Sequence, residues 1–158
     1  MKHLKIGDAA PSFTSKDQEG KEIKLANYKG KKVVIYFYPK DNTPGCTAQA
    51  CNLRDNYDDI IKEGIIILGV SADDEGKHKK FISKFDLPFT LLADTEKKLL
   101  NLYGVWGEKK FMGKTYDGIH RTTFLLDENH IIVGIIDKPK TKDHAREILE
   151  IYHKQATT

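Results

Sequence analysis

The sequence predicts an α/β fold with a central mixed β-sheet flanked by helices. Two continuous apolar runs, residues 33–38 and 65–70, have the β-branched and aromatic composition of strands that are covered on both faces. One long helix is expected between them, so the two strands form a right-handed βαβ unit and lie parallel. Residues 122–126 and 131–136 flank a turn-prone segment and predict an antiparallel hairpin. Parallel and antiparallel pairs together make the sheet mixed.

The remaining elements complete this arrangement at both ends of the chain. Residues 12–14 and 23–25, separated by the turn-prone run 17–20, predict an N-terminal β-hairpin. Helices are expected at residues 75–85, 97–103 and 142–152, and a short strand at residues 90–92. A βαβ half followed by a ββα half is the thioredoxin-like arrangement. Without repeats or a low-complexity linker, the prediction is a single domain over residues 1–158.

Charge and composition exclude several classes of function. The 26 basic and 23 acidic residues give a formal charge of +3, and they are scattered rather than gathered into the basic face that a nucleic-acid partner requires. No segment approaches the length of a membrane span, and residues 1–8 have no apolar signal-peptide core. Two cysteines are too few for a disulfide scaffold. The expected location is the reducing cytoplasm, where a cysteine pair is more often catalytic or metal-binding than structural.

Both cysteines lie where the strand at residues 33–38 gives way to the long helix. Cys46 falls at the start of that helix, where unpaired backbone N–H groups and the positive end of the helix dipole favour the thiolate. Cys46 is therefore a candidate nucleophile. It also begins an apolar stripe at helical spacing, which continues through Ala50, Leu53, Tyr57 and Ile60 or Ile61.

The position of Cys51 restricts what the cysteine pair can do. On an intact helix, Cys51 is rotated by about 140° from Cys46 and lies about 7.5 Å further along the axis. A disulfide requires Cα atoms within about 7 Å and converging Cβ atoms, so a structural disulfide is not expected. The six scattered histidines do not complete a metal site with the two sulfurs. Two readings stay open: two unrelated core thiols, or a pair that joins after the first helical turns unwind.

The residues before Cys46 favour the second reading. Thr43 lies three residues before Cys46, where its hydroxyl can meet the thiolate or a polar substrate, although local evidence alone favours an ordinary N-cap or turn threonine. Gly45 permits close backbone approach at the helix start. Pro39 and Pro44 stiffen the loop and remove N–H donors.

The spacing of Pro39, Thr43 and Cys46 resembles the active-site signature of the peroxiredoxins. Residues 43–55 resemble, more narrowly, the bacterioferritin comigratory protein or peroxiredoxin Q subfamily. The resemblance extends over almost the whole chain, from residues 7–13 through residues 103–107 to residues 121–127.

This resemblance implies a thiol peroxidase with Cys46 as the peroxidatic residue, which hydrogen peroxide or an alkyl hydroperoxide oxidises to a sulfenic acid. It implies that Cys51 is the resolving residue, that the resulting disulfide is reduced by thioredoxin or a related dithiol protein, and that the protein is a monomer. Arg121 matches the catalytic arginine of the family, whose charge favours the thiolate and whose donors meet the peroxide oxygens. Thr43 would hold the peroxide in line and Pro39 would shield the sulfenate. No metal, flavin or haem is required.

The chain departs from the resemblance at Gln49, where relatives often carry glutamate. An amide can accept a hydrogen bond from Arg121, but it lacks the negative charge. Two other functions are weighed against the peroxidase. A disulfide oxidoreductase of the same fold would use Cys-x-x-Cys rather than the spacing seen here, and a redox sensor would present an unwound helix to a partner.

Overall fold

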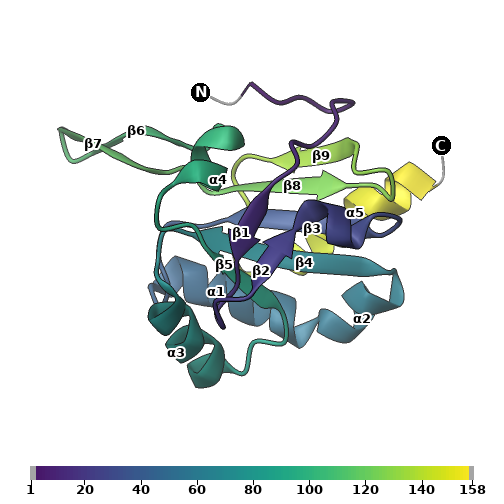
Figure 1. The fold of residues 1–158 in the computed structure, drawn as a ribbon, viewed down its shortest axis with the longest axis horizontal. Coiled ribbons are helices and arrows are strands. Elements are labelled where there is room, and N and C mark those ends of the chain that lie inside the picture. The colour runs from purple at the N-terminus through teal and green to yellow at the C-terminus, as the bar shows by residue number, and fades with distance from the viewer. Residues whose placement is uncertain (1–2, 157–158) are drawn as a thin grey trace.

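The computed structural model describes residues 3–156, and a five-stranded sheet in the order β5-β4-β3-β8-β9 forms its centre (Figure 1). The strands are β3 (Lys32–Phe37), β4 (Ile65–Ser71), β5 (Thr90–Ala93), β8 (Thr122–Leu126) and β9 (Ile132–Ile136). β3, β4 and β5 run parallel, whereas β8 pairs antiparallel with both β3 and β9. The predicted mixed sheet and thioredoxin-like arrangement are confirmed. Residues 1–2 and 157–158, which belong to the expected domain, lie outside the described residues.

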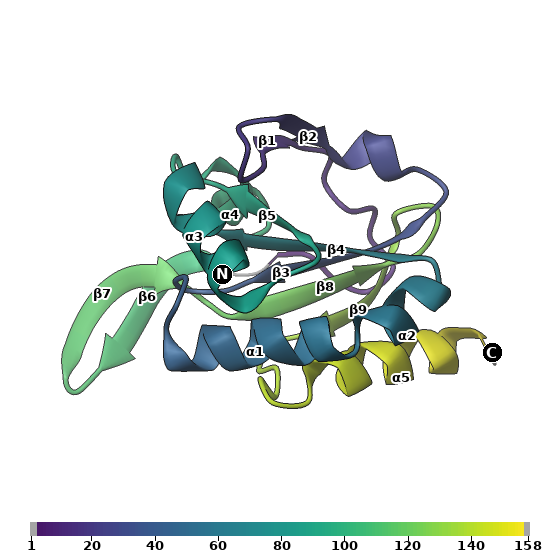
Figure 2. The same cartoon turned by 90° about the horizontal axis from the view of Figure 1, so that it is seen from below.

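Each face of the sheet carries its own hydrophobic core, because successive side chains of a strand point to opposite faces. On β3, Val33, Ile35 and Phe37 join one core, and Val34 and Tyr36 join the other. Side chains from four helices cover the second face: α1 (Pro44–Asp55), α2 (Tyr57–Lys62), α3 (Glu75–Phe85) and α5 (His144–Ala156). Figure 2 shows α1 and α5 side by side along this face.

The first face is covered by shorter elements. These are β1 (Thr14–Lys16), β2 (Glu22–Lys24), the 3-10 helix η1 (Leu25–Tyr28) and α4 (Lys98–Leu102). The N-terminal hairpin is confirmed, with its strands displaced by one or two residues from the predicted ranges, and its turn is closed by Asp17, whose carboxylate accepts the N–H groups of Glu19 and Lys21. The helix expected at residues 75–85 has those bounds, and the final helix begins two residues later than expected and ends at Ala156.

The prediction of one long helix between β3 and β4 is wrong. The helix divides at Asn56, whose backbone dihedrals of −111° and 16° lie outside the helical range and separate α1 from α2. The Asn56 side chain donates a hydrogen bond to the Asn52 carbonyl, and such a local bond competes with the regular helix. The apolar stripe that begins at Cys46 ends at Ile60 rather than Ile61, because Ile60 is fully buried and Ile61 is 47% exposed.

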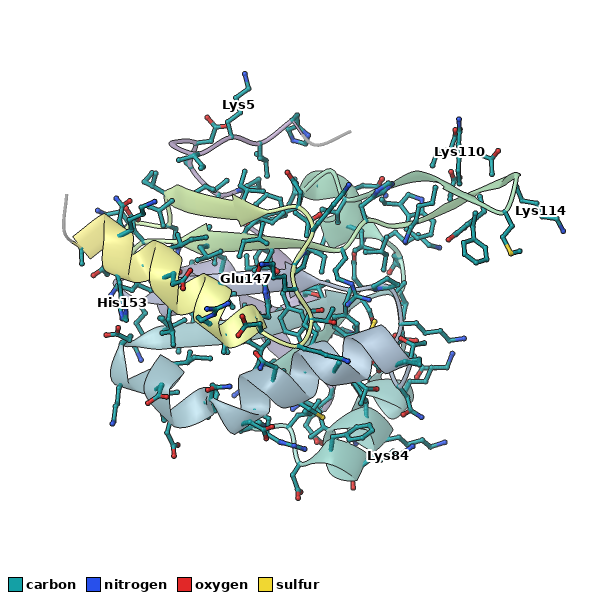
Figure 3. The ribbon with its side chains drawn as sticks, turned by 180° about the vertical axis from the view of Figure 1, so that it is seen from behind. Lys5, Lys84, Lys110, Lys114, Glu147 and His153 are labelled. Atoms are coloured by element: carbon teal, nitrogen blue, oxygen red, sulfur yellow. The ribbon has the colours of Figure 1, made fainter. Side chains whose placement is uncertain are left out.

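Two strands of the structure were not predicted from the sequence. β6 (Trp106–Phe111) and β7 (Lys114–Ile119) form an antiparallel ribbon that projects from the body (Figures 1 and 2). Most of its side chains are exposed, so it lacks the apolar alternation that reveals a half-buried strand. Lys110 and Lys114 lie toward its far end, as Figure 3 shows.

Candidate active site

Cys46 lies in the first turns of α1, at the edge of the sheet formed by the strand ends, beside the carboxyl end of the central strand β3. α1 begins at Pro44, and no acidic residue occupies its first turn to oppose the positive end of the helix dipole. The Cys46 side chain is 2% exposed and packs in the core between the sheet and its helices. The predicted core-facing position of Cys46 is therefore what the structure shows, and its thiol is free.

Strand register brings Arg121 to the same edge. Phe37, the last residue of β3, pairs with Thr122, the first residue of β8. Because the strands are antiparallel, the segment that enters β8 lies beside the loop that leaves β3. Arg121, directly before β8, thereby reaches the start of α1 although 75 residues separate it from Cys46 in the sequence.

The guanidinium of Arg121 contacts two side chains of α1. Its Nη2 lies 3.4 Å from Cys46 Sγ, and its Nη1 donates a 2.7 Å hydrogen bond to Gln49 Oε1. Gln49 is fully buried. Gly45 makes room for this approach, since a Cβ atom there would stand 3.2 Å from Nη2. A fixed positive charge beside the sulfur favours its thiolate form and offers donors to an oxygen that gains negative charge.

Thr43 is the N-cap residue of α1, but its side chain makes no capping bond. Its hydroxyl instead donates to the carbonyl of Lys40 at 2.9 Å, across the loop between β3 and α1. This leaves the lone pairs of Oγ1 free to accept a hydrogen bond. Pro39, half-buried, follows Tyr38 at the start of the same loop.

Cys51 lies five residues beyond Cys46 on the same intact helix, and its free thiol is partly exposed. No disulfide joins the two residues. Of the predicted site residues, Cys46 and Arg121 are in contact, and Thr43 lies at the N-cap of the same helix; these three residues are called the Cys46 group. Pro39 lies at the start of the preceding loop, and Cys51 lies further along the helix.

Lys109 of β6 is a neighbour of this group that the sequence did not single out. Its ammonium donates to the Ile119 carbonyl at 2.9 Å, and together with Arg121 it lines a cavity of about 430 Å³. Burial lowers the pKa of Lys109, the positive charge of Arg121 lowers it further, and Cys46 raises it. Its only sequence signal was a pair of lysines, which is typical of a solvated surface.

The sequence also gave no sign of a buried polar cluster behind the loop. Asp41, within the loop, contacts the fully buried ring of His78 on α3, with 2.6 Å between Asp41 Oδ2 and His78 Nδ1. Asp73, which follows β4, accepts a 2.8 Å hydrogen bond from the backbone N–H of Asp41. These contacts join the loop to two elements more than 30 residues away.

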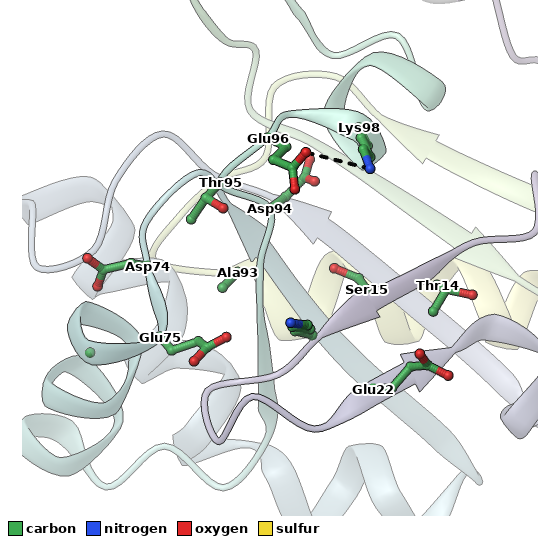
Figure 4. Close-up of a pocket in the computed structure, with 12 residues that line it drawn as sticks. Thr14, Ser15, Glu22, Asp74, Glu75, Ala93, Asp94, Thr95, Glu96 and Lys98 are labelled. Atoms are coloured by element: carbon green, nitrogen blue, oxygen red, sulfur yellow. Dashed lines mark ion pairs between the residues drawn. The ribbon is translucent and has the colours of Figure 1, made fainter.

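A separate cavity of about 540 Å³ lies between the N-terminal hairpin and the start of α3, and Figure 4 shows it. Five of its twelve lining residues are acidic, Glu22, Asp74, Glu75, Asp94 and Glu96, and two are lysines, Lys16 and Lys98. None of the predicted site residues lines it, so it is distinct from the Cys46 group.

Comparisons with known proteins identify the family to which the chain belongs. The model of the AhpC/TSA family matches residues 6–135, which is most of the chain. This chain belongs to that family. It is 49% identical over 149 residues to the peroxiredoxin Bcp of Escherichia coli, an alignment that covers 94% of this chain and 96% of the relative.

Solved structures place the chain in the same branch of this family. A bacterioferritin comigratory protein from Xanthomonas campestris, whose structures address its alkyl peroxide reduction, superposes with a TM-score of 0.87 at 33% identity, covering 99% of both chains. A mutant of PrxQ from Xylella fastidiosa gives a TM-score of 0.91 at 29% identity, again over 99% of both chains. The protein is a Bcp/PrxQ peroxiredoxin, and the members of this branch are thiol peroxidases.

Among residues 3–156, no helix is both long and apolar enough to cross a bilayer. As a peroxiredoxin, the protein acts on a peroxide and depends on a thiol reductant.

Proposed function

We propose that this peroxiredoxin reduces hydrogen peroxide and organic hydroperoxides through Cys46. The observation that carries the proposal is the 3.4 Å contact between Cys46 Sγ and Arg121 Nη2 at the start of α1. The Cys46 thiolate attacks one peroxide oxygen, an S–O bond forms as the O–O bond breaks, and Cys46 becomes a sulfenic acid. The other oxygen takes up a proton and leaves as water or as an alcohol.

Three further residues assist this step in the proposal. Arg121 favours the thiolate and donates to the oxygen on which negative charge develops. Thr43, whose own proton is directed to the Lys40 carbonyl, accepts the O–H of the peroxide and holds it in line. Pro39, half-buried beside the loop, limits the access of water to the sulfenate. This chemistry requires no metal, flavin or haem.

Cys51 completes the cycle as the resolving residue. Its thiol condenses with the Cys46 sulfenic acid, water is released, and an intramolecular disulfide forms. The two residues share one intact helix, so the segment from Cys46 to Cys51 must unwind before the sulfurs can meet. A dithiol protein of the thioredoxin type then reduces the disulfide. In this proposal the chain works as a single-domain monomer in the cytoplasm, where reductants keep both thiols available.

Substitution of Cys46 tests the first half of the cycle. Cys46→Ser should abolish peroxide consumption, because an alcohol at this position is not ionised near neutral pH and forms no sulfenic acid. Thioredoxin-coupled oxidation of NADPH, measured with hydrogen peroxide and with a bulkier hydroperoxide, reports the turnover. Normal turnover in Cys46→Ser would refute the proposal.

Substitution of Cys51 tests the second half. Cys51→Ser should consume one equivalent of peroxide per chain, with a first-turnover rate close to that of the wild type, and should then fail to be recycled by thioredoxin. Mass spectrometry after one equivalent of peroxide should show a sulfenic acid rather than a disulfide. Steady turnover at the wild-type rate would show that Cys51 is not the resolving residue.

A further inference from the structure

Behind the loop that carries Thr43 lies a cluster of buried polar side chains that the peroxidase chemistry does not use. It consists of Asp41, Asp73 and His78, each at most 8% exposed. Tyr38 donates to Asp41 Oδ1 at 2.6 Å, and Ser71 donates to Asp73 Oδ2 at 2.7 Å. Buried polar groups are costly unless they are paired, so a network of this size has to be explained.

The hydrogen-bond partners of the His78 ring show where its hydrogens lie. His78 Nε2 faces the Leu92 carbonyl at 2.9 Å, so it carries a hydrogen and donates. His78 Nδ1 faces Asp41 Oδ2, and two lone pairs would repel each other there, so a further proton lies between them. Asp41 is thereby tied to α3 through one nitrogen of the ring, while the other nitrogen is tied to β5.

The cluster is the only group among the described residues whose side chains have the spacing of a metal site. Three of its four carboxylate oxygens already take part in protein hydrogen bonds, however. Both carboxylate oxygens of Asp41 and Oδ2 of Asp73 receive protein hydrogen bonds from Tyr38, His78, Ser71 and the Asp41 backbone. A cation at the centre would have to displace these donors. The donor set therefore fits a hydrogen-bonded support for the loop better than a metal site.

One peptide group connects this cluster with Thr43. The N–H of Asp41 donates to Asp73 Oδ2 at 2.8 Å. The C=O of the same peptide group, which belongs to Lys40, accepts the Thr43 hydroxyl at 2.9 Å. A peptide group is planar and rigid, with its N–H and C=O on opposite sides when trans, and no cis bond occurs among the described residues. Fixing one side of the plane therefore fixes the direction of the other.

We infer that Asp73 and His78 are positioning residues for the peroxide-binding hydroxyl of Thr43. Asp73 sets the plane of the Lys40–Asp41 peptide, and His78 holds the Asp41 side chain so that this plane cannot rotate. The Lys40 carbonyl then accepts the hydrogen bond from the Thr43 hydroxyl, so the lone pairs of Oγ1 are directed at the substrate. This inference rests on the proposed function, because it assigns these residues to the step in which Thr43 holds the peroxide.

A double-mutant cycle between Asp73 and Thr43 tests the inference. Asp73→Ala should lower kcat/KM for hydrogen peroxide roughly 10- to 100-fold, the loss expected when a reacting group is misplaced. Alkylation of Cys46 by iodoacetamide should change less than about twofold, since the Arg121 contact remains. In a Thr43→Val background, Asp73→Ala should have no further effect, because the hydroxyl it positions is gone. His78→Asn should give the same pattern with a smaller loss.

Tyr152→Phe is the matched control, because it removes buried hydrogen bonds to the Val33 and Leu126 carbonyls and leaves the loop untouched. It should lower the urea midpoint without changing either rate. If Asp73→Ala does not fold, Asp73→Asn takes its place, since the neutral amide oxygen is a weaker acceptor and should cause a smaller loss with the same non-additivity.

Two results would overturn the inference: equal losses in peroxide reduction and in alkylation, or additive effects of Asp73→Ala and Thr43→Val. Both presuppose an active wild type. Failure of the proposed function would look different, because the wild-type protein itself would then not consume peroxide through Cys46.

Discussion

At the residue scale, Arg121 serves two partners on one helix. Its two terminal nitrogens reach Gln49 Oε1 and Cys46 Sγ, which a single ammonium could not do with the same fork geometry. Gln49 is neutral and therefore holds the guanidinium without offsetting its charge. Its own Nε2 is buried and has no hydrogen-bond partner among the described residues. A buried donor without a partner lowers the stability of the fold by about 1–3 kcal/mol. The side-chain amide of Gln49 is therefore not explained by a gain in stability.

We predict that Gln49→Glu lowers the reactivity of Cys46. A carboxylate would pair with Arg121 and weaken the positive field at the sulfur, so the sulfur should react more slowly with an electrophile. The rate of alkylation by iodoacetamide at pH 6 should drop by more than about 10-fold, because two charges a few ångströms apart interact by a few kcal/mol at the effective dielectric constant of a protein.

Gln155→Glu, the same change at an exposed position near the end of α5, is the control and should leave the rate unchanged. An unchanged rate at pH 6 in Gln49→Glu would mean that the charge of Arg121 does not govern the reactivity of Cys46.

At the scale of elements, the two halves of α1 are held differently. Asn52 joins the second half to the start of α5: its Nδ2 donates to the Lys142 carbonyl, and its Oδ1 accepts the Ala145 N–H. The first turns are linked to the rest of the fold through the Arg121 contacts and the packing of Cys46 and Ala50. Unwinding from Cys46 to Cys51 can therefore stop at Asn52, with Asp41 anchoring the loop at the other side.

This difference predicts a local change on oxidation. Amides of residues 48–51 should be protected from hydrogen exchange in the reduced protein and lose most of that protection in the disulfide form, because their helical bonds break. Amides of residues 53–55 donate to the carbonyls of residues 49–51 and should lose protection as well, whereas amides of α3 should keep theirs. Native-state exchange followed by mass spectrometry compares the two forms. Equal protection of residues 48–51 in both would contradict a disulfide formed by local unwinding.

At the scale of the whole molecule, a second buried histidine links the sheet to α5. His144 Nδ1 lies 2.9 Å from Glu147 Oε1, and its Nε2 lies 2.9 Å from the Thr123 hydroxyl of β8. Burial lowers its pKa from the usual 6.5, the contacts with Glu147 raise it in part, and the charge of Arg121 lowers it. The unfolded chain therefore binds a proton at a higher pH than the folded one.

The consequence is a contribution to stability that is full above about pH 6.5 and is lost as the pH falls from there toward the lowered pKa of the folded state. Urea denaturation should give a lower midpoint at pH 5.5 than at pH 7.5. In His144→Asn, which retains a donor toward Glu147 but does not titrate, the difference between the two midpoints should be smaller. An equal difference in both proteins would show that His144 is not responsible.

Patterns along the chain predicted much of the fold, because they are local. The apolar runs predicted as β3 and β4 form strands within one residue of the expected bounds, and the predicted hairpin of β8 and β9 is present. The division at Asn56 was missed because it depends on a single side chain competing with the backbone. The exposed ribbon of β6 and β7 was missed because its pairing buries few side chains.

The sequence by itself determined the position of Cys46 at a helix start and the separation of Cys51 from it. It also determined the resemblance to a family whose motif residues match Thr43 and Arg121. Only the tertiary structure decided which distant residues meet there. The antiparallel register of β3 and β8 brings Arg121 to the sulfur, and the ends of β4 and α3 bring Asp73 and His78 behind the loop. Such contacts depend on how strands pair across the sheet, and nothing in the local sequence around these residues encodes their partners.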